Sequence, residues 1–317
     1  MKQSGWLKAA ALFSMAVLSL FVAACQSSGA SGAAKAANPV AVNKGTTVSN
    51  PLTPPAQGNI PVAFLISEGA VVIDFTGPWE VFQDTSIPGR KDSVFRLYTV
   101  AETMKPIHAS GGMKIVPDYT IANAPTPKVL VIPAQSTLSP ATKDWVRKVA
   151  KTNDVTMSVC TGAFQLASTG LLSGKPATTH HSSYTNLATQ FPDVQVKRGA
   201  RFVEAGSIAT AGGLSSGIDL ALRVVERYYG HEVARQTAFD MEYQGEGWTN
   251  ADSNSVYAQA YEQTEEHPVC PVCGMAVDPA TAPKSVYKGK TYYFMSDQHK
   301  QQFEGSPETY LDSSKKQ

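Results

Sequence analysis

The chain has 317 residues, enough for one large domain or two, and 43% of them are hydrophobic against 17% charged. This composition is typical of a globular protein with a sizeable core, and it excludes a chain that is disordered throughout. The formal net charge of +1 provides no broad basic surface, so we expect no nucleic-acid partner.

The first 24 residues have the features of a targeting segment. Lys2 and Lys8 give a positive start, and residues 9–24 form an apolar run of 16 residues that stops in front of Cys25. A membrane-spanning helix needs about 20 residues, which favours a cleaved signal peptide over the alternative, an uncleaved anchor helix. The run resembles a bacterial lipobox. That resemblance implies lipidation of Cys25 and a lipid-anchored protein of the cell envelope, at the outer membrane or in the periplasm of a diderm bacterium.

Residues 25–58 consist mainly of small and polar residues and carry few bulky side chains. Such a stretch buries too little apolar surface to offset the entropy of ordering it, so we predict a flexible tether between lipid and folded body. Cleavage after residue 24 removes two lysines, which leaves 25 basic against 26 acidic residues. The mature chain then faces an oxidising compartment, where each cysteine needs a specific reason.

Residues 59–246 alternate between strand-like and helix-like patterns, followed by a polar linker over residues 247–266. We expect strands at 61–66, 95–100, 128–132, 155–159 and 207–211, and helices at 77–82, 143–151, 214–229 and 231–243. The continuous apolar run at 61–66 is typical of a buried parallel strand, and Gly230 is placed to end the helix before it. This order predicts an α/β domain with a flavodoxin-like, doubly wound parallel sheet.

Cys160 stands where the strand 155–159 turns into a helix. Ligands of α/β sheets bind beyond the carboxyl ends of the strands, and the small residues Gly162 and Ala163 permit the sharp turn of a nucleophile elbow. The N–H groups of the following helix should favour the reactive thiolate. A buried core cysteine is the alternative interpretation.

Five short motifs accompany this cysteine. They are Ser-Val-Cys-Thr-Gly-Ala at 158–163, Thr-Gly-Leu-Leu at 169–172, Ala-Thr-Thr-His at 177–180, Asp-Phe-Thr-Gly-Pro at 74–78 and Ala-Gly-Gly at 211–213. Together they resemble the ThiJ/PfpI superfamily, which has the class I glutamine-amidotransferase-like fold, and within it the isonitrile hydratase group. The resemblance covers nearly all of residues 60–243.

The resemblance implies a role for each of four residues. Cys160 would be the nucleophile, Asp74 the carboxylate that hydrogen-bonds the thiol or relays a proton, Thr161 the group that orients substrate or water, and His180 a nearby imidazole. In isonitrile hydration the thiolate attacks the isocyanide carbon, and water releases a formamide from the resulting thioimidate. The substrate would be a small molecule, and no cofactor is implied. For Asp74 and Thr161, helix capping is the alternative role.

One motif departs from the family. After the strand 128–132 the family usually has Pro-Gly-Gly, whose N–H groups help to bind an oxyanion, whereas this chain has Pro133-Ala134-Gln135. Ala134 can still donate its N–H, so Ala134 and Gly162 are the candidate substrate-binding residues, but the close approach that glycine permits is lost. The departure bears on the activity and not on the fold.

Cys270 and Cys273 have the spacing of a metal knuckle, because two intervening residues let both sulfurs reach one ion. A Tyr-x-Gly-x-x-Tyr-Tyr-Phe hairpin and a Ser-x-x-His helix start, with Ser296 as N-cap, follow. In this order, over residues 267–313, the motifs resemble the YHS domain, a small metal-associated module.

The resemblance makes Cys270, Cys273 and His299 candidate metal ligands, with Met295 or water as the fourth. Thiolates with a thioether favour Cu(I), and two cysteines, a histidine and water suit Zn²⁺. A Cys270–Cys273 disulfide is the alternative in an oxidising compartment.

Two functions therefore stand side by side. One is a cysteine-dependent enzyme, an isonitrile hydratase-like lyase or hydrolase acting on a small electrophile. The other is a lipoprotein that binds copper or zinc or senses stress without catalysis, and a chaperone-like role rests on fold analogy alone. A homodimer is one option for the assembly.

Overall fold

The computed structural model describes residues 48–258, 266, 268–272 and 277–311. The predicted signal peptide, Cys25, residues 25–47 of the predicted tether and Cys273 lie outside the described residues. Within the described part of the chain, no helix is long and apolar enough to cross a membrane.

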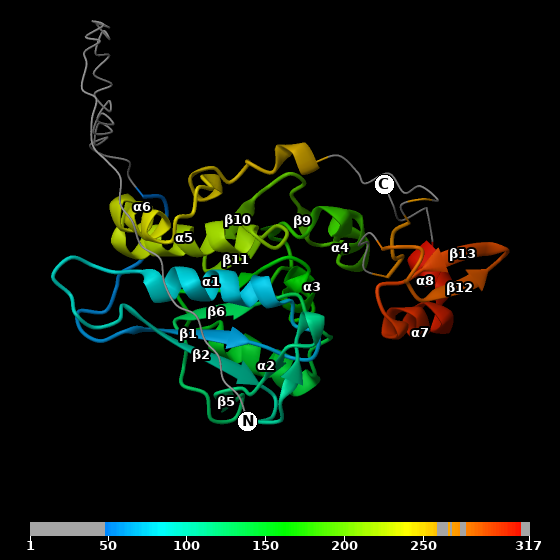
Figure 1. Cartoon of the computed structure of the whole chain (residues 1–317), viewed down its shortest axis with the longest axis horizontal. Coiled ribbons are helices and arrows are strands. Elements are labelled where there is room, and N and C mark those ends of the chain that lie inside the picture. Colours follow the sequence, from blue (N-terminus) through cyan, green and yellow to red (C-terminus); the bar gives the residue numbers. More distant parts are fainter. Residues whose placement is uncertain (1–47, 259–265, 267, 273–276, 312–317) are drawn as a thin grey trace, which may run out of the picture. The chain divides into compact units, whose positions relative to one another are not determined.

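A seven-stranded sheet forms the centre of the α/β domain (Figure 1). Its strands, in spatial order, are β10 (Phe202–Ala205), β11 (Ile208–Ala211), β7 (Val155–Ser158), β6 (Val129–Ile132), β1 (Ile60–Leu65), β2 (Phe95–Ala101) and β5 (Tyr119–Thr120). All neighbouring pairs are parallel except β10 with β11. The predicted doubly wound, parallel-dominated sheet is confirmed.

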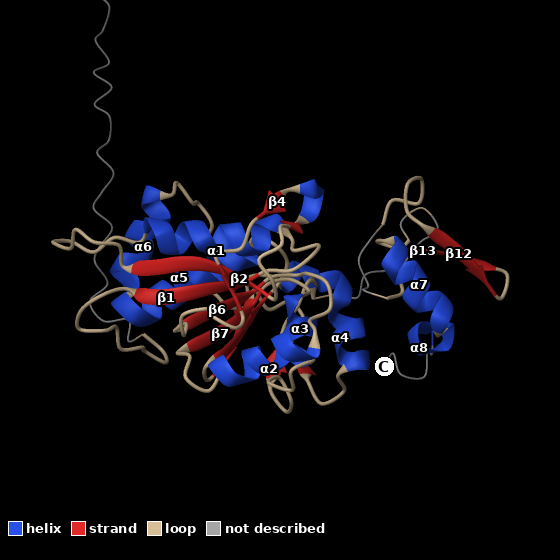
Figure 2. Ribbon diagram, turned by 90° about the horizontal axis from the view of Figure 1, so that it is seen from below, coloured by secondary structure: helices blue, strands red, loops and turns tan. Residues whose placement is uncertain are grey.

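Helices cover both faces of this sheet. On one face pack α1 (Val72–Asp84), α5 (Ser216–Tyr229) and α6 (His231–Asp240), and on the other pack α2 (Pro140–Val149) and α3 (Gly162–Ala167) (Figure 2). Successive side chains of a strand point to opposite faces. In β1, Val62 and Phe64 accordingly join the core under α1 and α5, while Ala63 and Leu65 join the other core. Burial on both sides explains the unbroken apolar run that predicted this strand.

Two helix starts differ from the prediction. Helix α1 begins at Val72, five residues before the expected start at residue 77, so Pro78 lies inside it and Asp74 in its first turn. Proline is common in a first turn, which is why it suggested a later start. Helix α5 begins at Ser216, and Leu214, expected on its apolar stripe, lies in the preceding turn with a φ of 40°.

Several short elements carry too little sequence signal to be predicted. Besides the edge strands β5 and β10, they are the pair β3 (Ile107–His108) with β4 (Lys114–Ile115), the pair β8 (Pro176–Ala177) with β9 (Gln195–Val196), and helix α4 (Tyr184–Gln190). Two-residue strands are too short to show an alternating pattern.

Both segments that flank the α/β domain pack against it. Residues 48–58, predicted as the end of the tether, include Leu52, whose N–H donates to the Arg227 carbonyl at 2.7 Å. Residues 247–258, predicted as the start of the linker, bury Trp248 and bond to Arg201 through the Ala251 carbonyl. The folded body therefore includes residues on each side of 59–246.

The C-terminal module has its own small core. The hairpin of β12 (Lys284–Tyr287) and β13 (Lys290–Tyr293) is followed by α7 (Asp297–Gly305) and α8 (Pro307–Leu311). Its buried residues are Cys270, Val272, Phe294 and Phe303. The predicted N-cap is confirmed, because the Ser296 hydroxyl accepts the His299 N–H at 3.2 Å.

Candidate active site and metal-binding residues

Cys160 occupies a strained turn directly after β7. Its φ of 58° is unfavourable for a residue with a side chain, and such strain is often found at functional sites. Two hydrogen bonds fix its backbone: its N–H donates to the Gly212 carbonyl at 2.9 Å, and its carbonyl accepts the Thr179 hydroxyl at 2.9 Å. The preceding Val159 N–H donates to the Ile132 carbonyl at 3.0 Å. The neighbouring strands thus hold the elbow that the sequence predicted.

Gly162 permits this turn by its lack of a side chain. A Cβ at this position would lie 2.2 Å from the Ile132 carbonyl oxygen, far inside van der Waals contact. The structure therefore places Gly162 against the backbone at the end of β6, buried away from solvent. This close packing accounts for the glycine, and substrate contact remains a prediction.

The Cys160 thiol is almost completely buried, at 1% exposure. Burial, and secondly the charge of Asp74, raise its pKa from 9.0 to about 12. The backbone N–H groups of Thr161 and Leu214 donate to the sulfur and lower the pKa by less than burial raises it. The direction is opposite to the thiolate expected from the helix N-terminus, because desolvation outweighs the two N–H groups.

Asp74 is the partner of this thiol. It is fully buried, and burial raises the pKa of its carboxyl from 3.8 to about 7, against the lowering effect of hydrogen bonds from Ala134 and Cys160. Helix α1 has no side-chain cap at its N-terminus, so the capping alternative for Asp74 is wrong. Two titratable groups with raised pKa values in direct contact are a recurring feature of proton-transfer sites.

The backbone N–H of Ala134 is a hydrogen-bond donor to Asp74. Its N–H donates to Asp74 Oδ2 at 3.1 Å, across 60 positions of sequence. The N–H that the family resemblance assigns to the substrate is therefore committed to the carboxyl group. Ala134 acts on the site through Asp74.

Thr161 and His180 lie in different relations to the thiol. Thr161 hydrogen-bonds the sulfur through its N–H and its hydroxyl, and its hydroxyl does not cap α3. His180 Nδ1 accepts the Ser182 N–H at 3.3 Å and pairs with the Ser182 hydroxyl at 2.8 Å. Burial lowers the pKa of His180 to about 4, so the ring is neutral at physiological pH.

No hydrogen bond joins His180 to Cys160 among the interactions of the described residues. The His180 ring instead packs on Gly213, where a Cβ would lie only 2.4 Å from its Cδ2 atom. Gly213 precedes Leu214, whose N–H reaches the sulfur. His180 therefore supports the turn that presents Leu214.

Sequence reasoning missed Leu214 as a site residue. Its N–H contacts the Cys160 sulfur from a turn with positive φ, and its side chain is 40% exposed. The available signal was the Ala-Gly-Gly motif at 211–213, because two glycines before an apolar residue indicate a close approach of backbone.

In the C-terminal module, Cys270 and His299 lie side by side. Cys270 Sγ and His299 Nδ1 are 3.6 Å apart. Zn–S and Zn–N bonds of about 2.3 and 2.0 Å at a tetrahedral angle would separate the two ligand atoms by about 3.5 Å. The pair thus fits two ligands of one ion, and a thiol–imidazole hydrogen bond spans the same distance.

The other two candidate ligands, Cys273 and Met295, give less structural support for a metal site. Cys273 lies outside the described residues, and Met295 is 41% exposed. No cluster of three or more His, Cys, Asp or Glu side chains able to hold a metal occurs among the residues that the structure describes. Within the described residues, the candidate ligands are therefore Cys270, His299 and Met295.

Comparison with known proteins gives two family matches. The model of the DJ-1/PfpI family matches residues 61–227, and the model of the YHS domain matches residues 269–313. Isonitrile hydratase of Pseudomonas putida is 30% identical over 187 residues, which cover 57% of this chain and 78% of that enzyme. The crystal structure of a ThiJ/PfpI family protein from Pseudomonas syringae superposes with a TM-score of 0.53 at 25% identity, covering 64% of this chain and 82% of that one.

A transcriptional regulator is also similar to this chain. The HTH-type transcriptional regulator CdhR of Pseudomonas aeruginosa is 28% identical over 150 residues. The match covers 46% of this chain and 44% of the regulator, so this chain spans under half of that protein. The proteins similar to this chain thus include an enzyme and a regulator.

Proposed function

This chain belongs to the DJ-1/PfpI family and carries a YHS domain, and from this premise we propose that its α/β domain hydrates small isonitriles through the thiol of Cys160. The similarity to isonitrile hydratase supports the proposal. The observation that carries it is the direct contact between two buried groups, the Cys160 thiol and the Asp74 carboxyl. Such a pair can exchange one proton without exposing it to solvent.

The first half of the reaction uses this proton. Asp74, with a pKa of about 7, takes the thiol proton as the sulfur attacks the isonitrile carbon, and delivers it to the same carbon. The product is a thioimidate bonded to Cys160. Because the carboxyl returns to its starting state, no external acid is needed.

The second half uses water. Water adds to the thioimidate carbon, the carbon–sulfur bond breaks, and the formamide leaves while the thiol regains its proton. Neither half of the reaction begins by forming the oxyanion that amide hydrolysis forms. The hydrogen bond from the Ala134 N–H to Asp74 is therefore compatible with isonitrile hydration. The same hydrogen bond disfavours a peptidase or amidotransferase reaction at this site.

The test is conversion of cyclohexyl isocyanide to N-cyclohexylformamide by the purified protein. We expect turnover by the wild type and none by Cys160→Ser, with near-native thermal stability in both. Ser173→Ala, which alters an exposed serine of the α/β domain, is the control and should retain full activity. Equal turnover by wild type and Cys160→Ser would contradict the proposal.

A second candidate function, metal binding, concerns the YHS domain. We propose that Cys270, Cys273 and His299 hold a soft or borderline ion, Cu(I) or Zn²⁺, and the 3.6 Å separation of Cys270 Sγ and His299 Nδ1 supports this. Titration of reduced protein with each metal should give one bound ion, and His299→Ala should weaken binding. Uptake unchanged in that variant would exclude His299 as a ligand.

Lipid anchoring at Cys25 is a further part of the proposal. It rests on the apolar run that ends in front of this cysteine. Expression in a bacterial host with labelled palmitate should label the wild type in the envelope fraction and leave Cys25→Ser unlabelled. Label retained in the variant would contradict it.

A further inference from the structure

Three buried side-chain oxygens, in the loops after β1 and β6 and in the first turn of α1, have no hydrogen-bond partner among the described residues. They are Ser67 Oγ, Asp74 Oδ1 and Gln135 Oε1. Asp74 itself is 0% exposed. Buried polar atoms are normally satisfied by protein or by an ordered water, so these three point to a small polar ligand.

The three atoms belong to neighbouring parts of the chain at the carboxyl ends of β1 and β6. The Ser136 N–H donates to the Glu68 carbonyl at 3.0 Å, and the Val71 N–H donates to the Ala134 carbonyl at 2.8 Å. These bonds hold the loop containing Ser67 against the loop containing Gln135. The bond from Ala134 to Asp74 attaches the carboxyl group to the same pair of loops.

The orientation of the Gln135 amide is fixed. Its Nε2 donates to the Leu65 carbonyl at 3.0 Å, and a carbonyl only accepts, so Oε1 is the atom left over. Gln165 holds the Gln135 backbone carbonyl through its own Nε2 at 3.2 Å. Gln135 directly follows Ala134, whose N–H donates to Asp74, so this preset acceptor belongs to the loop that holds the carboxyl group.

We propose that Gln135 Oε1, Ser67 Oγ and Asp74 Oδ1 bind the water that cleaves the thioimidate, an inference that rests on the proposed function. A buried water usually makes about two to four hydrogen bonds, so three polar partners are enough to hold one. The water oxygen bonds to the thioimidate carbon as the carbon–sulfur bond breaks. One water proton ends on the substrate nitrogen and the other, through Asp74, on the sulfur of Cys160, which yields the formamide and the free thiol.

Gln135 is a positioning residue in this scheme. Its amide oxygen accepts a hydrogen bond from a water O–H and neither gains nor loses a proton, so it acts only in the second half of the reaction. This also gives a reason for glutamine at a strand end where the family usually has glycine: the side chain fills the position with a hydrogen-bond acceptor.

The test compares thiol addition with thioimidate hydrolysis in the full chain, using cyclohexyl isocyanide. In Gln135→Leu we expect the formamide rate to fall about ten- to a hundredfold, as for loss of a hydrogen bond to a reacting group, while the addition rate is unchanged. Intact-protein mass spectrometry should then show the adduct of one isocyanide accumulating, which the wild type does not show. Ser67→Ala removes an atom without a partner, so it should fold normally and show the same adduct.

Gln195→Leu, which alters an exposed glutamine, is the matched control and should behave as wild type. Unchanged formamide rates in both site variants, or addition slowed as much as hydrolysis, would overturn the water assignment while leaving the hydratase proposal in place. A wild type that forms neither adduct nor formamide would overturn the hydratase proposal and this inference with it.

Discussion

At the scale of single residues, burial decides the protonation of the candidate site. Desolvation raises the pKa of Asp74 to about 7 and that of Cys160 to about 12. At neutral pH the thiol is therefore protonated and the carboxyl is close to half ionised. The site stores its proton near the reacting sulfur, and Asp74 can both accept and return it.

The raised pKa of Asp74 predicts a pH-dependent stability. In the folded state the Asp74 carboxyl keeps its proton up to about pH 7, whereas in the unfolded state it loses the proton near pH 3.8. The contribution of this group to the free energy of unfolding is therefore greatest at low pH and decreases as the pH rises from 3.8 to about 7. Asp74→Asn removes the ionisable group, and its melting temperature should exceed that of wild type at pH 8 but match it at pH 4. Its isonitrile turnover should fall by about 10²–10⁴.

Thermal melts at a series of pH values measure this difference. Asp240→Asn, which alters an exposed carboxylate on α6, is the control and should shift the melting temperature equally little at both pH values. A difference between Asp74→Asn and wild type that does not vary with pH would contradict the assigned pKa.

At the scale of elements, two strained turns meet at the thiol. Cys160 after β7 and Leu214 before α5 both have positive φ, at 58° and 40°, and strain of this kind costs about 1–3 kcal/mol per residue. The sequence predicted the first turn, because a cysteine followed by small residues at a strand end is a local pattern. For the second turn the sequence predicts helix, because Leu214 continues the apolar stripe of α5.

The contact between α3 and the end of β6 predicts a sharp response at Gly162. In Gly162→Ala the new Cβ meets the Ile132 carbonyl oxygen at 2.2 Å, and backbone cannot move aside as a flexible side chain can. We expect a loss of about 1–3 kcal/mol in unfolding free energy, measured by urea denaturation, together with loss of turnover. Gly305→Ala in α7, where a Cβ meets nothing within 4 Å, is the control and should not destabilise. Wild-type stability of Gly162→Ala would show that α3 does not pack tightly on β6.

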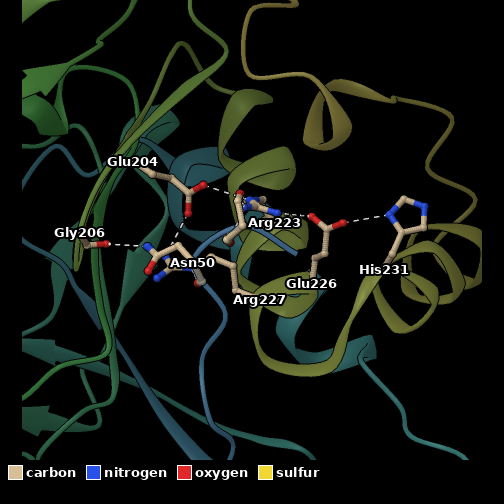
Figure 3. Close-up of polar contacts among 8 residues, drawn as sticks. Asn50, Glu204, Gly206, Arg223, Glu226, Arg227 and His231 are labelled. Atoms are coloured by element: carbon tan, nitrogen blue, oxygen red, sulfur yellow. Dashed lines mark hydrogen bonds and ion pairs between the residues drawn. The ribbon is translucent and has the colours of Figure 1, made fainter. Parts of the chain in front are cut away.

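At the scale of the whole molecule, a buried network of charges joins the N-terminal segment to the α/β domain (Figure 3). Arg223 donates to Glu204 at 3.0 Å and to Glu226 at 2.5 Å, and it also bonds the Ser49 carbonyl at 2.8 Å. Arg227 bonds Glu204 at 3.0 Å and the Asn50 carbonyl at 2.8 Å. The described end of the predicted tether is therefore attached to α5 by hydrogen bonds from α5 arginines.

This network predicts that removing one arginine releases the segment. Arg223→Ala leaves Glu204 and Glu226 with fewer partners, and breaking a buried pair costs about 3–5 kcal/mol. We expect a lower unfolding free energy and faster hydrogen exchange at the Leu52 amide, which donates to the Arg227 carbonyl. Arg235→Ala, which breaks an exposed pair with Glu232, should change stability by less than about 1 kcal/mol. Unchanged exchange at Leu52 in Arg223→Ala would show that the arginine does not hold the segment.

Features that lie within short stretches of chain could be predicted from the sequence. The apolar runs identified the main strands, the Cys160 elbow followed from small residues at a strand end, and the Cys270–Cys273 spacing identified the knuckle. Helix starts were less well determined, as at Val72 and Ser216, because proline and apolar periodicity do not mark the first residue of a helix.

The chemistry around the thiol depends on contacts that form only in the folded chain. The tertiary structure joined Asp74 to Ala134 across 60 positions, brought the Leu214 N–H to the sulfur and left Gln135 Oε1 as a buried acceptor. It also reversed the expected shift of the thiol pKa, since desolvation depends on every element packed around a group. Hydrogen-bond partners and burial arise from residues far apart in sequence, and no local pattern contains them.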